Sequence, residues 1–127
     1  MNNREILLLD TNTILYLING DENVLQLIDQ NPIAVNFIIE IELLSWPFMN
    51  DELKQILINI IKDSRYFDYS FQLKQLTIDL RQKYKLKLGD AFIAATSLAY
   101  DLTLISADKV FSKIPAIKLI NFTPSVT

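Results

Sequence analysis

Hydrophobic positions along the chain follow two patterns that alternate with each other. Short apolar runs are typical of buried parallel strands, and the candidate strands occupy residues 5–9, 33–37, 65–69, 102–106 and 116–120. The segments between them carry apolar residues at helical spacing. Strands that alternate with helices predict right-handed crossovers and a parallel sheet that is covered on both faces. We therefore expect an α/β fold of three layers, α/β/α, with a central parallel sheet of about five strands.

The helical segments are separated by residues that end helices. The candidate helices occupy residues 12–19, 24–28, 38–46, 51–61, 71–85 and 88–100. Pro32 and Pro47 each follow a helical segment that they cannot continue, and Ser70 can cap the helix that follows it. The last helix is apolar on nearly every side, which predicts that it is buried at the centre of the fold.

Composition favours one compact domain. The chain has 127 residues, of which 50% are hydrophobic and 21% are charged, so it can bury a sizeable core. It contains only 2 glycines and 4 prolines, and no stretch of its sequence has the composition of a flexible linker. We expect residues 1–127 to form a single domain.

The absence of two residue types narrows the possible chemistry. The chain has no cysteine, which excludes disulfides and thiolate metal sites, and no histidine, which excludes the usual zinc ligands and histidine bases. Any catalysis must therefore use carboxylates, hydroxyls, amides, lysines, arginines or a bound cofactor. The net charge of −3 argues against nonspecific binding of nucleic acid by the whole surface, although a local basic patch stays compatible with it.

No segment has the pattern of a secretion signal or a membrane span. The first apolar run is interrupted by Asp10, and the longest apolar region, residues 32–49, contains the polar residues Asn36, Glu40 and Glu42. We expect a cytoplasmic protein that does not associate with membranes.

Four acidic residues occupy equivalent places relative to the predicted elements. Asp10 ends the first strand, Glu42 lies early in the helix after the second strand, Asp90 opens the buried helix, and Asp108 follows a later strand. The carboxyl ends of parallel strands share one edge of a sheet, so we expect all four side chains at that edge. Carboxylates without histidine or cysteine suit a hard cation such as Mg²⁺ or Mn²⁺. Each residue also has a structural interpretation, as a helix cap, a turn residue or a solvated charge.

The segments around these acids resemble the PIN domain, and above all the small VapC-type toxins of toxin–antitoxin pairs. The matching segments are LLLDTN at 7–12, IELL at 41–44, LGDAFIAAT at 88–96 and LISADKVF at 104–111. The resemblance implies a metal-dependent endoribonuclease that cuts RNA, forms a homodimer and is neutralised by a cognate antitoxin protein. It also implies that Asp10, Glu42, Asp90 and Asp108 are the catalytic residues and hold one or two Mg²⁺ or Mn²⁺ ions.

Three further polar residues are candidates for orienting these carboxylates. Ser106 matches the small hydroxyl residue that accompanies the fourth acid in the family, and Thr11 and Asn12 directly follow Asp10. Helix capping is the alternative role for all three. The chain departs from the family at Gly89, where proline is common, and at Ile39 and Ala107, where polar residues are frequent.

Two other features have both a functional and a structural interpretation. The basic run Arg81, Lys83, Lys85 and Lys87 could guide RNA phosphates toward the site, but cations at a helix C-terminus are the favoured interpretation.

The apolar group Trp46, Phe48 and Met49, beside Pro47, could dock an antitoxin or a second subunit. Packing in the core is the favoured interpretation of this group.

Two rival functions are compatible with parts of the pattern. A catalytically silent PIN-like module would bind RNA or protein without cutting. A haloacid-dehalogenase-like phosphatase also begins with apolar residues and an aspartate, but it needs a second aspartate two positions later, where this chain has Asn12. The phosphatase is therefore disfavoured.

Overall fold

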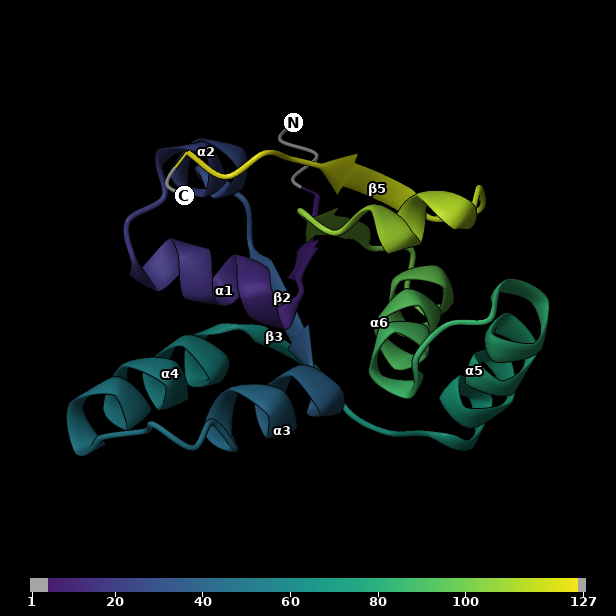
Figure 1. Cartoon of the computed structure of the whole chain (residues 1–127), viewed down its shortest axis with the longest axis horizontal. Helices are drawn as coiled ribbons and strands as arrows, with labels where there is room; N and C mark the ends of the chain where they lie inside the picture. Colours follow the sequence, from purple (N-terminus) through teal and green to yellow (C-terminus); the bar gives the residue numbers. More distant parts are fainter. Residues whose placement is uncertain (1–4, 126–127) are drawn as a thin grey trace.

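The computed structural model describes residues 5–125 and has a five-stranded sheet at its centre (Figure 1). The strands are β1 (Leu7–Leu9), β2 (Ile33–Asn36), β3 (Arg65–Phe67), β4 (Thr103–Ser106) and β5 (Lys118–Asn121). They lie in the order β3-β2-β1-β4-β5, and every neighbouring pair is parallel. The predicted α/β fold with a parallel sheet of about five strands is confirmed.

Helices cover both faces of this sheet. The helices are α1 (Thr11–Ile18), α2 (Glu22–Ile28), α3 (Phe37–Leu44), α4 (Asp51–Asp63), α5 (Phe71–Tyr84) and α6 (Leu88–Ala99). Helices α1 to α4 lie on one side, and α5 and α6 lie on the other (Figure 1). The chain moves from β1 to β2 to β3 and then returns past β1 to β4, so right-handed crossovers must change faces at that return.

Polar caps explain why several elements begin where they do. Asn36 ends β2 and its side chain accepts a hydrogen bond from the Ile39 N–H, so the strand predicted to reach residue 37 ends one residue earlier and α3 begins at Phe37. Ser70 caps α5 as predicted, by accepting a hydrogen bond from the Leu73 N–H. The predicted strand at residues 5–9 is too long at its start, because β1 begins at Leu7.

One short element lies outside the predicted set. A 3₁₀ helix, η1 (Lys109–Lys113), follows β4, and Asp108 caps it. The break predicted near residue 19 is confirmed: Gly20, with a φ of 80°, lies between α1 and α2 in a conformation that favours glycine.

The central strands and α6 form the middle of the core. Leu8, Leu9, Leu104 and Ile105 on β1 and β4 are fully buried. Helix α6 buries mainly small residues, among them Ala91, Ala94 and Ala95, and the prediction of a central, buried helix is confirmed. Within residues 5–125, no helix is long and apolar enough to cross a membrane.

Candidate active site at the carboxyl edge of the sheet

The strand order determines where a site is expected. Strand β1 is joined to β2 on one side, whereas β4, its other neighbour, is reached only after the chain has reversed direction. Parallel α/β sheets bind ligands in the crevice that such a reversal opens at the carboxyl ends of the strands. Here that crevice lies where β1 and β4 end, at Leu9 and Ser106.

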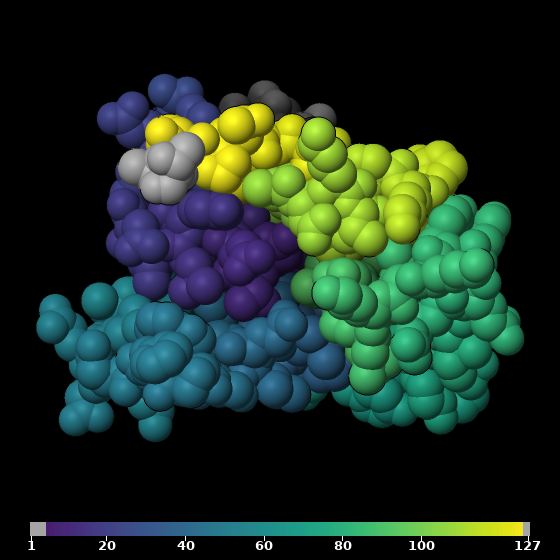
Figure 2. All heavy atoms as spheres, in the orientation of Figure 1, coloured from purple at the N-terminus to yellow at the C-terminus, as the bar shows by residue number. Residues whose placement is uncertain are grey.

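All four predicted acidic residues belong to segments at this edge. Asp10 follows β1, Glu42 lies in the second turn of α3, Asp90 lies in the first turn of α6, and Asp108 follows β4. In Figure 2 the beginning of α1 (dark purple) meets α3 (blue), α6 (green) and the segment after β4 (yellow-green) on one face of the molecule.

Asp10 is the most firmly held of the four acids. Its side chain is only 7% exposed. The carboxylate oxygen Oδ1 accepts hydrogen bonds from the N–H and the hydroxyl of Thr13, at 3.0 and 2.5 Å, and Oδ2 accepts one from the Ser106 hydroxyl at 2.5 Å. The register that pairs Leu9 with Ile105 brings Asp10 and Ser106 side by side. Asp10 is therefore both the cap of α1 and a carboxylate of fixed orientation.

Glu42 connects α3 to the starts of α1 and α6. The Thr11 hydroxyl donates a hydrogen bond of 2.6 Å to its Oε1. Its Oε2 lies beside Gly89, where an added Cβ would come within 3.4 Å of that oxygen. The glycine at this position thus leaves the Glu42 carboxylate close to the backbone at the beginning of α6.

Asn36 fastens α3 to α6 beneath these carboxylates. It is fully buried, and its amide nitrogen donates hydrogen bonds to the Thr96 hydroxyl at 2.9 Å and to the Phe92 carbonyl at 3.4 Å. Its oxygen caps α3, as described above. One side chain therefore fixes the relative position of the helices that carry Glu42 and Asp90.

Asp90 shows that the four acids share one electrostatic environment. Burial raises the pKa of the Asp90 carboxyl, and the neighbouring charges of Asp108, Glu42 and, less strongly, Asp10 raise it further. Lys87 opposes them and lowers the pKa. Asp90 accepts no hydrogen bond from any residue in the range 5–125 that would offset this repulsion.

Asp108 caps the 3₁₀ helix and lies close enough to Asp90 for its charge to act there. It is exposed, and its Oδ1 caps η1 by accepting a hydrogen bond of 2.9 Å from the Val110 N–H. Its own N–H donates to the Ser106 hydroxyl at 3.0 Å, so Ser106 joins the backbone of Asp108 to the carboxylate of Asp10. The turn interpretation of Asp108 is confirmed, and the residue still contributes its charge to the environment of Asp90.

The four carboxylates influence one another electrostatically but do not form a ready-made metal site. Within the described part of the chain, no three acidic side chains form a group that could hold a metal ion. Yet the pKa of Asp90 is raised by each of the other three, so they are close enough to repel one another. Carboxylate oxygens supported by hydroxyl donors are what Mg²⁺ and Mn²⁺ prefer.

Two hollows border the carboxylates, and Asn12 lines both of them. One, of about 230 Å³, is lined by Thr11, Asn12, Leu15, Glu42, Leu43, Trp46 and Leu57. The other, of about 210 Å³, is lined by Asp10, Asn12, Tyr16, Ala107 and Asp108. Of the three predicted orienting residues, Thr11 and Ser106 each donate to a carboxylate, whereas the exposed Asn12 side chain makes no hydrogen bond within residues 5–125.

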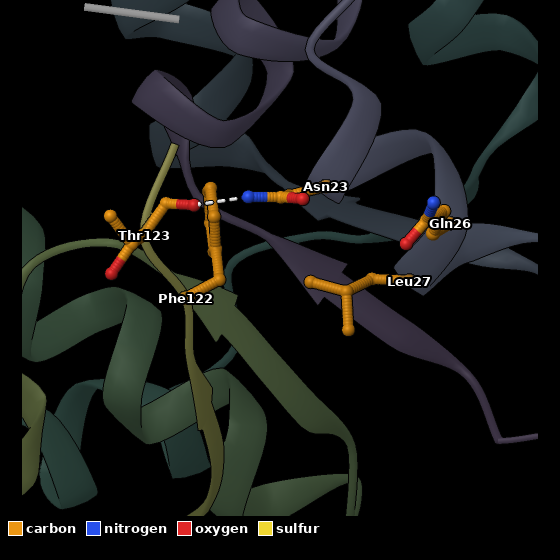
Figure 3. A pocket seen from close by; sticks show the side chains of 5 residues that line it. All are labelled: Asn23, Gln26, Leu27, Phe122 and Thr123. Atoms are coloured by element: carbon orange, nitrogen blue, oxygen red, sulfur yellow. Dashed lines mark hydrogen bonds between the residues drawn. The ribbon is translucent and has the colours of Figure 1, made fainter. Parts of the chain in front are cut away.

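A third hollow lies away from the acids. It has a volume of about 340 Å³ and is formed by α2 and the segment after β5 (Figure 3). The Asn23 amide donates a hydrogen bond of 2.7 Å to the Thr123 carbonyl at its rim. Its lining residues, Asn23, Gln26, Leu27, Phe122 and Thr123, include no titratable side chain, so this hollow offers no acid or base.

The basic run contributes one residue to the site. Arg81 and Lys83 lie in the last turn of α5, and Lys85 ends that helix in the left-handed conformation, as expected for cations at a helix C-terminus. Arg81 also donates a hydrogen bond to the Leu86 carbonyl. Among these residues, Lys87 is the one whose charge acts on Asp90.

The favoured interpretation of the apolar group at residues 46–49 is wrong for two of its members. Trp46 is 46% exposed and Phe48 is 75% exposed, so neither is a core residue, whereas Met49 is partly buried against the core. The reason is position: both rings lie in the connection between α3 and α4, where they contact each other in a T-shaped pair with centroids 5.6 Å apart.

Sequence reasoning missed two residues that support the site, Thr13 and Asn36. The spacing of Asp10 and Thr13, from the cap to the third helical residue, is a capping pattern that can be recognised in a sequence. An asparagine at the end of an apolar strand is a comparable signal for Asn36.

Comparisons with known proteins agree with this geometry. The family model of the PIN domain matches residues 7–117. A chain of a toxin–antitoxin complex from Klebsiella pneumoniae is 27% identical, with 90% of this chain and 95% of that chain covered and a TM-score of 0.78. No curated protein matches significantly.

Two further solved structures show the same fold at lower identity. A chain of VapBC2 from Rickettsia felis, bound to a DNA fragment from its promoter, is 24% identical, with 93% of this chain and 99% of that chain covered and a TM-score of 0.79. A chain of DNA-bound VapBC from Salmonella typhimurium is 20% identical, with 91% and 97% covered and a TM-score of 0.81. Because the family model matches most of the sequence, the chain belongs to the PIN domain family.

Proposed function

We propose that this protein is a metal-dependent endoribonuclease that hydrolyses RNA phosphodiesters and acts as the toxin of a toxin–antitoxin pair. The observation that carries the proposal is the shared environment of four carboxylates at the crevice between β1 and β4, expressed in the raised pKa of Asp90. Repulsion among four carboxylates destabilises the folded protein, and a bound cation would offset it. Such clusters of titratable groups are typical of functional sites. Membership of the PIN domain family supports the same reaction class.

In this proposal Asp10 and Asp90 bind the metal directly, and Glu42 and Asp108 bind it directly or through water. The site takes one or two Mg²⁺ or Mn²⁺ ions. When bound, such an ion supplies positive charge at the phosphate and water of lowered pKa, which makes a histidine base unnecessary. The absence of histidine from the chain is consistent with this chemistry.

The neighbouring side chains hold the carboxylates for this task. Ser106 and Thr13 together engage both oxygens of Asp10, and Thr11 engages one oxygen of Glu42. Oδ1 of Asp10 accepts two hydrogen bonds, whereas Oδ2 of Asp10 and Oε1 of Glu42 accept one each and keep a second lone pair that can face a cation. Asp90 has no such partner within residues 5–125, which leaves it free to turn toward a ligand.

The toxin assignment includes two protein partners. We propose a cognate antitoxin and a second copy of this chain, in a homodimer. Support for the antitoxin partner comes from the Klebsiella pneumoniae toxin–antitoxin complex, one chain of which is similar to this chain over nearly the whole length of both.

The first test is cleavage of RNA by the purified protein. We expect total RNA to be cut at internal sites in the presence of Mg²⁺ or Mn²⁺, to stay intact when a chelator is added, and to be cut again when the metal is restored. Gel or sequencing analysis of the fragments is the measurement. Cleavage that continues in excess chelator would contradict the mechanism, and RNA binding without cleavage under any of these conditions would favour the silent binding module instead.

A second test concerns Ser106. Replacing it with alanine removes the donor to Asp10 Oδ2 and leaves the carboxylate unchanged. We expect Ser106→Ala to weaken Mn²⁺ binding by about 10- to 100-fold, as is typical when a group that supports a metal ligand is removed. Isothermal titration measures this affinity. Ser112→Ala, at an exposed position in η1, is the matched control and should bind Mn²⁺ like the unmodified protein; equal affinities for both variants would contradict the role of Ser106.

A further inference from the structure

We propose that the hollow beside Glu42 binds one nucleobase of single-stranded RNA, with Trp46 as the stacking surface and Asn12 at the edge of the base. This inference rests on the proposed function and adds a substrate-binding site to it. The hollow contains Glu42 in its wall, so its occupant lies next to the carboxylates.

The size of the hollow suits a single planar ring system. Its volume of about 230 Å³ is below the roughly 300–1,000 Å³ of pockets that enclose drug-sized ligands. Three leucines, Leu15, Leu43 and Leu57, form its apolar wall. It therefore has room for one base, and the rest of the RNA must continue outside it.

The charge of the lining indicates which part of RNA it accepts. The seven lining residues include one carboxylate and no lysine or arginine. No side chain of this lining can form a charge-assisted hydrogen bond to a phosphate. An uncharged base is the part of a nucleotide that this lining suits.

Trp46 has the features of a stacking residue. Trp46 is 46% exposed although it borders the hollow, and its ring makes a T-shaped contact with Phe48, at an interplanar angle of 72°, which restricts its orientation. Proteins that bind single-stranded nucleic acid stack bases on aromatic side chains of this kind, and each stack typically changes affinity by about 5- to 150-fold.

Asn12 and Thr11 supply the polar side of the hollow. The Asn12 amide has two donor hydrogens and an acceptor oxygen, and it makes no hydrogen bond within residues 5–125. It also lines the second hollow, beside Asp10 and Asp108. An RNA strand that places a base against Trp46 would thus pass Asn12 on its way to the buried carboxylate.

The chain has a built-in reporter for this site, because Trp46 is its single tryptophan. We expect a short single-stranded RNA to quench the tryptophan fluorescence of the Asp90→Asn variant in Mg²⁺, where it should not be cut. An abasic oligonucleotide of the same length carries the same phosphates but no base. We expect it to leave the fluorescence unchanged and to bind about 5- to 150-fold more weakly.

Variants tested with a fluorescently labelled RNA complete the experiment. We expect Trp46→Ala to weaken binding by about 5- to 150-fold and Trp46→Phe to restore most of the affinity, because phenylalanine can still stack. Phe71→Ala removes an even more exposed aromatic ring, on α5, and should bind RNA normally. Asn12→Ala should change the preference among the four homopolymeric RNAs.

Several results would overturn the inference. One is that the protein binds the RNA and the abasic oligonucleotide equally tightly. Another is that Trp46→Ala and Phe71→Ala bind RNA with equal affinity. A third is that the tryptophan fluorescence changes with protein concentration and not with RNA, which would indicate self-association at Trp46. If the unmodified protein cuts RNA and Trp46→Ala cuts it with an unchanged KM, the inference fails and the proposed function stands. If RNA quenches Trp46 but is never cut, the proposed function fails and the base site stands.

Discussion

Asp90→Asn should abolish metal-dependent RNA cleavage while leaving the protein folded. Asparagine has nearly the same shape but keeps only one oxygen and no charge, so the variant loses a proposed direct metal ligand. The loss should exceed the roughly 10- to 100-fold decrease expected for a group that only supports a ligand. The rate of cleavage of a defined RNA in Mg²⁺ or Mn²⁺ measures this effect.

The same substitution should stabilise the metal-free protein at neutral pH. In the folded state the pKa of Asp90 is raised by burial and by Asp108, Glu42 and Asp10. The folded chain therefore holds a proton more tightly than the unfolded chain, whose aspartates titrate at about 3.9. This contribution to the free energy of unfolding is fully present below that pH and is lost as the pH rises through the raised pKa. Asparagine cannot ionise, so it avoids the loss.

Thermal melts in excess chelator test this stability effect. The Tm of Asp90→Asn relative to the unmodified protein should increase from acidic to neutral pH, and added Mg²⁺ should raise the Tm of the unmodified protein more than that of the variant. Asp79→Asn, at an exposed position in α5, serves as the control and should change neither cleavage nor Tm appreciably. Full cleavage activity in Asp90→Asn, or a lower Tm at neutral pH, would overturn the assignment of Asp90.

Asn36→Ala should lower the free energy of unfolding more than the loss of a helix cap alone would. The substitution removes the cap of α3, at a typical cost of about 0.5–2 kcal/mol, and also the buried hydrogen bond to Thr96, for which about 0.5–1.5 kcal/mol is typical. We expect the free energy of unfolding to fall by about 2–3 kcal/mol in total, since Asn36 is fully buried and water cannot replace its partners. Chemical denaturation measures the change.

Asn50→Ala is the matched control for this prediction. Asn50 caps α4 through the Leu53 N–H, as Asn36 caps α3, but it is exposed and bonds to no other helix. It should therefore cost only about 1 kcal/mol. Equal losses for the two variants would show that the connection between α3 and α6 contributes nothing. If the connection does matter, Asn36→Ala should also weaken metal binding, because α3 and α6 carry Glu42 and Asp90.

The sequence was sufficient to predict features that depend on local pattern and on topology. The helix at residues 51–61 is predictable because its apolar stripe is a local pattern, and the structure extends it only to Asp63. The four acids could be assigned to one edge because parallel strands share their carboxyl ends, whatever their separation in the chain.

Features that depend on contacts between distant segments were not predictable in the same way. Trp46 and Phe48 have large apolar side chains of the kind found in cores. They are exposed because the connection between α3 and α4 places them at the surface. The 3₁₀ helix η1 has no periodicity long enough to recognise. Asn36 has partners 56 and 60 residues away, on a helix whose position against α3 emerges only in the folded chain.

The pairing of Asp10 with Ser106 has a consequence for the order in which a newly made chain can mature. A ribosome adds Asp10 first, whereas Ser106, in the β4 neighbour of β1, follows only 96 residues later. Until then, Asp10 lacks its partner and Asp108 does not yet exist. A nascent chain surrounded by ribosomal RNA therefore carries an incomplete acidic crevice until Ser106 and Asp108 have been added.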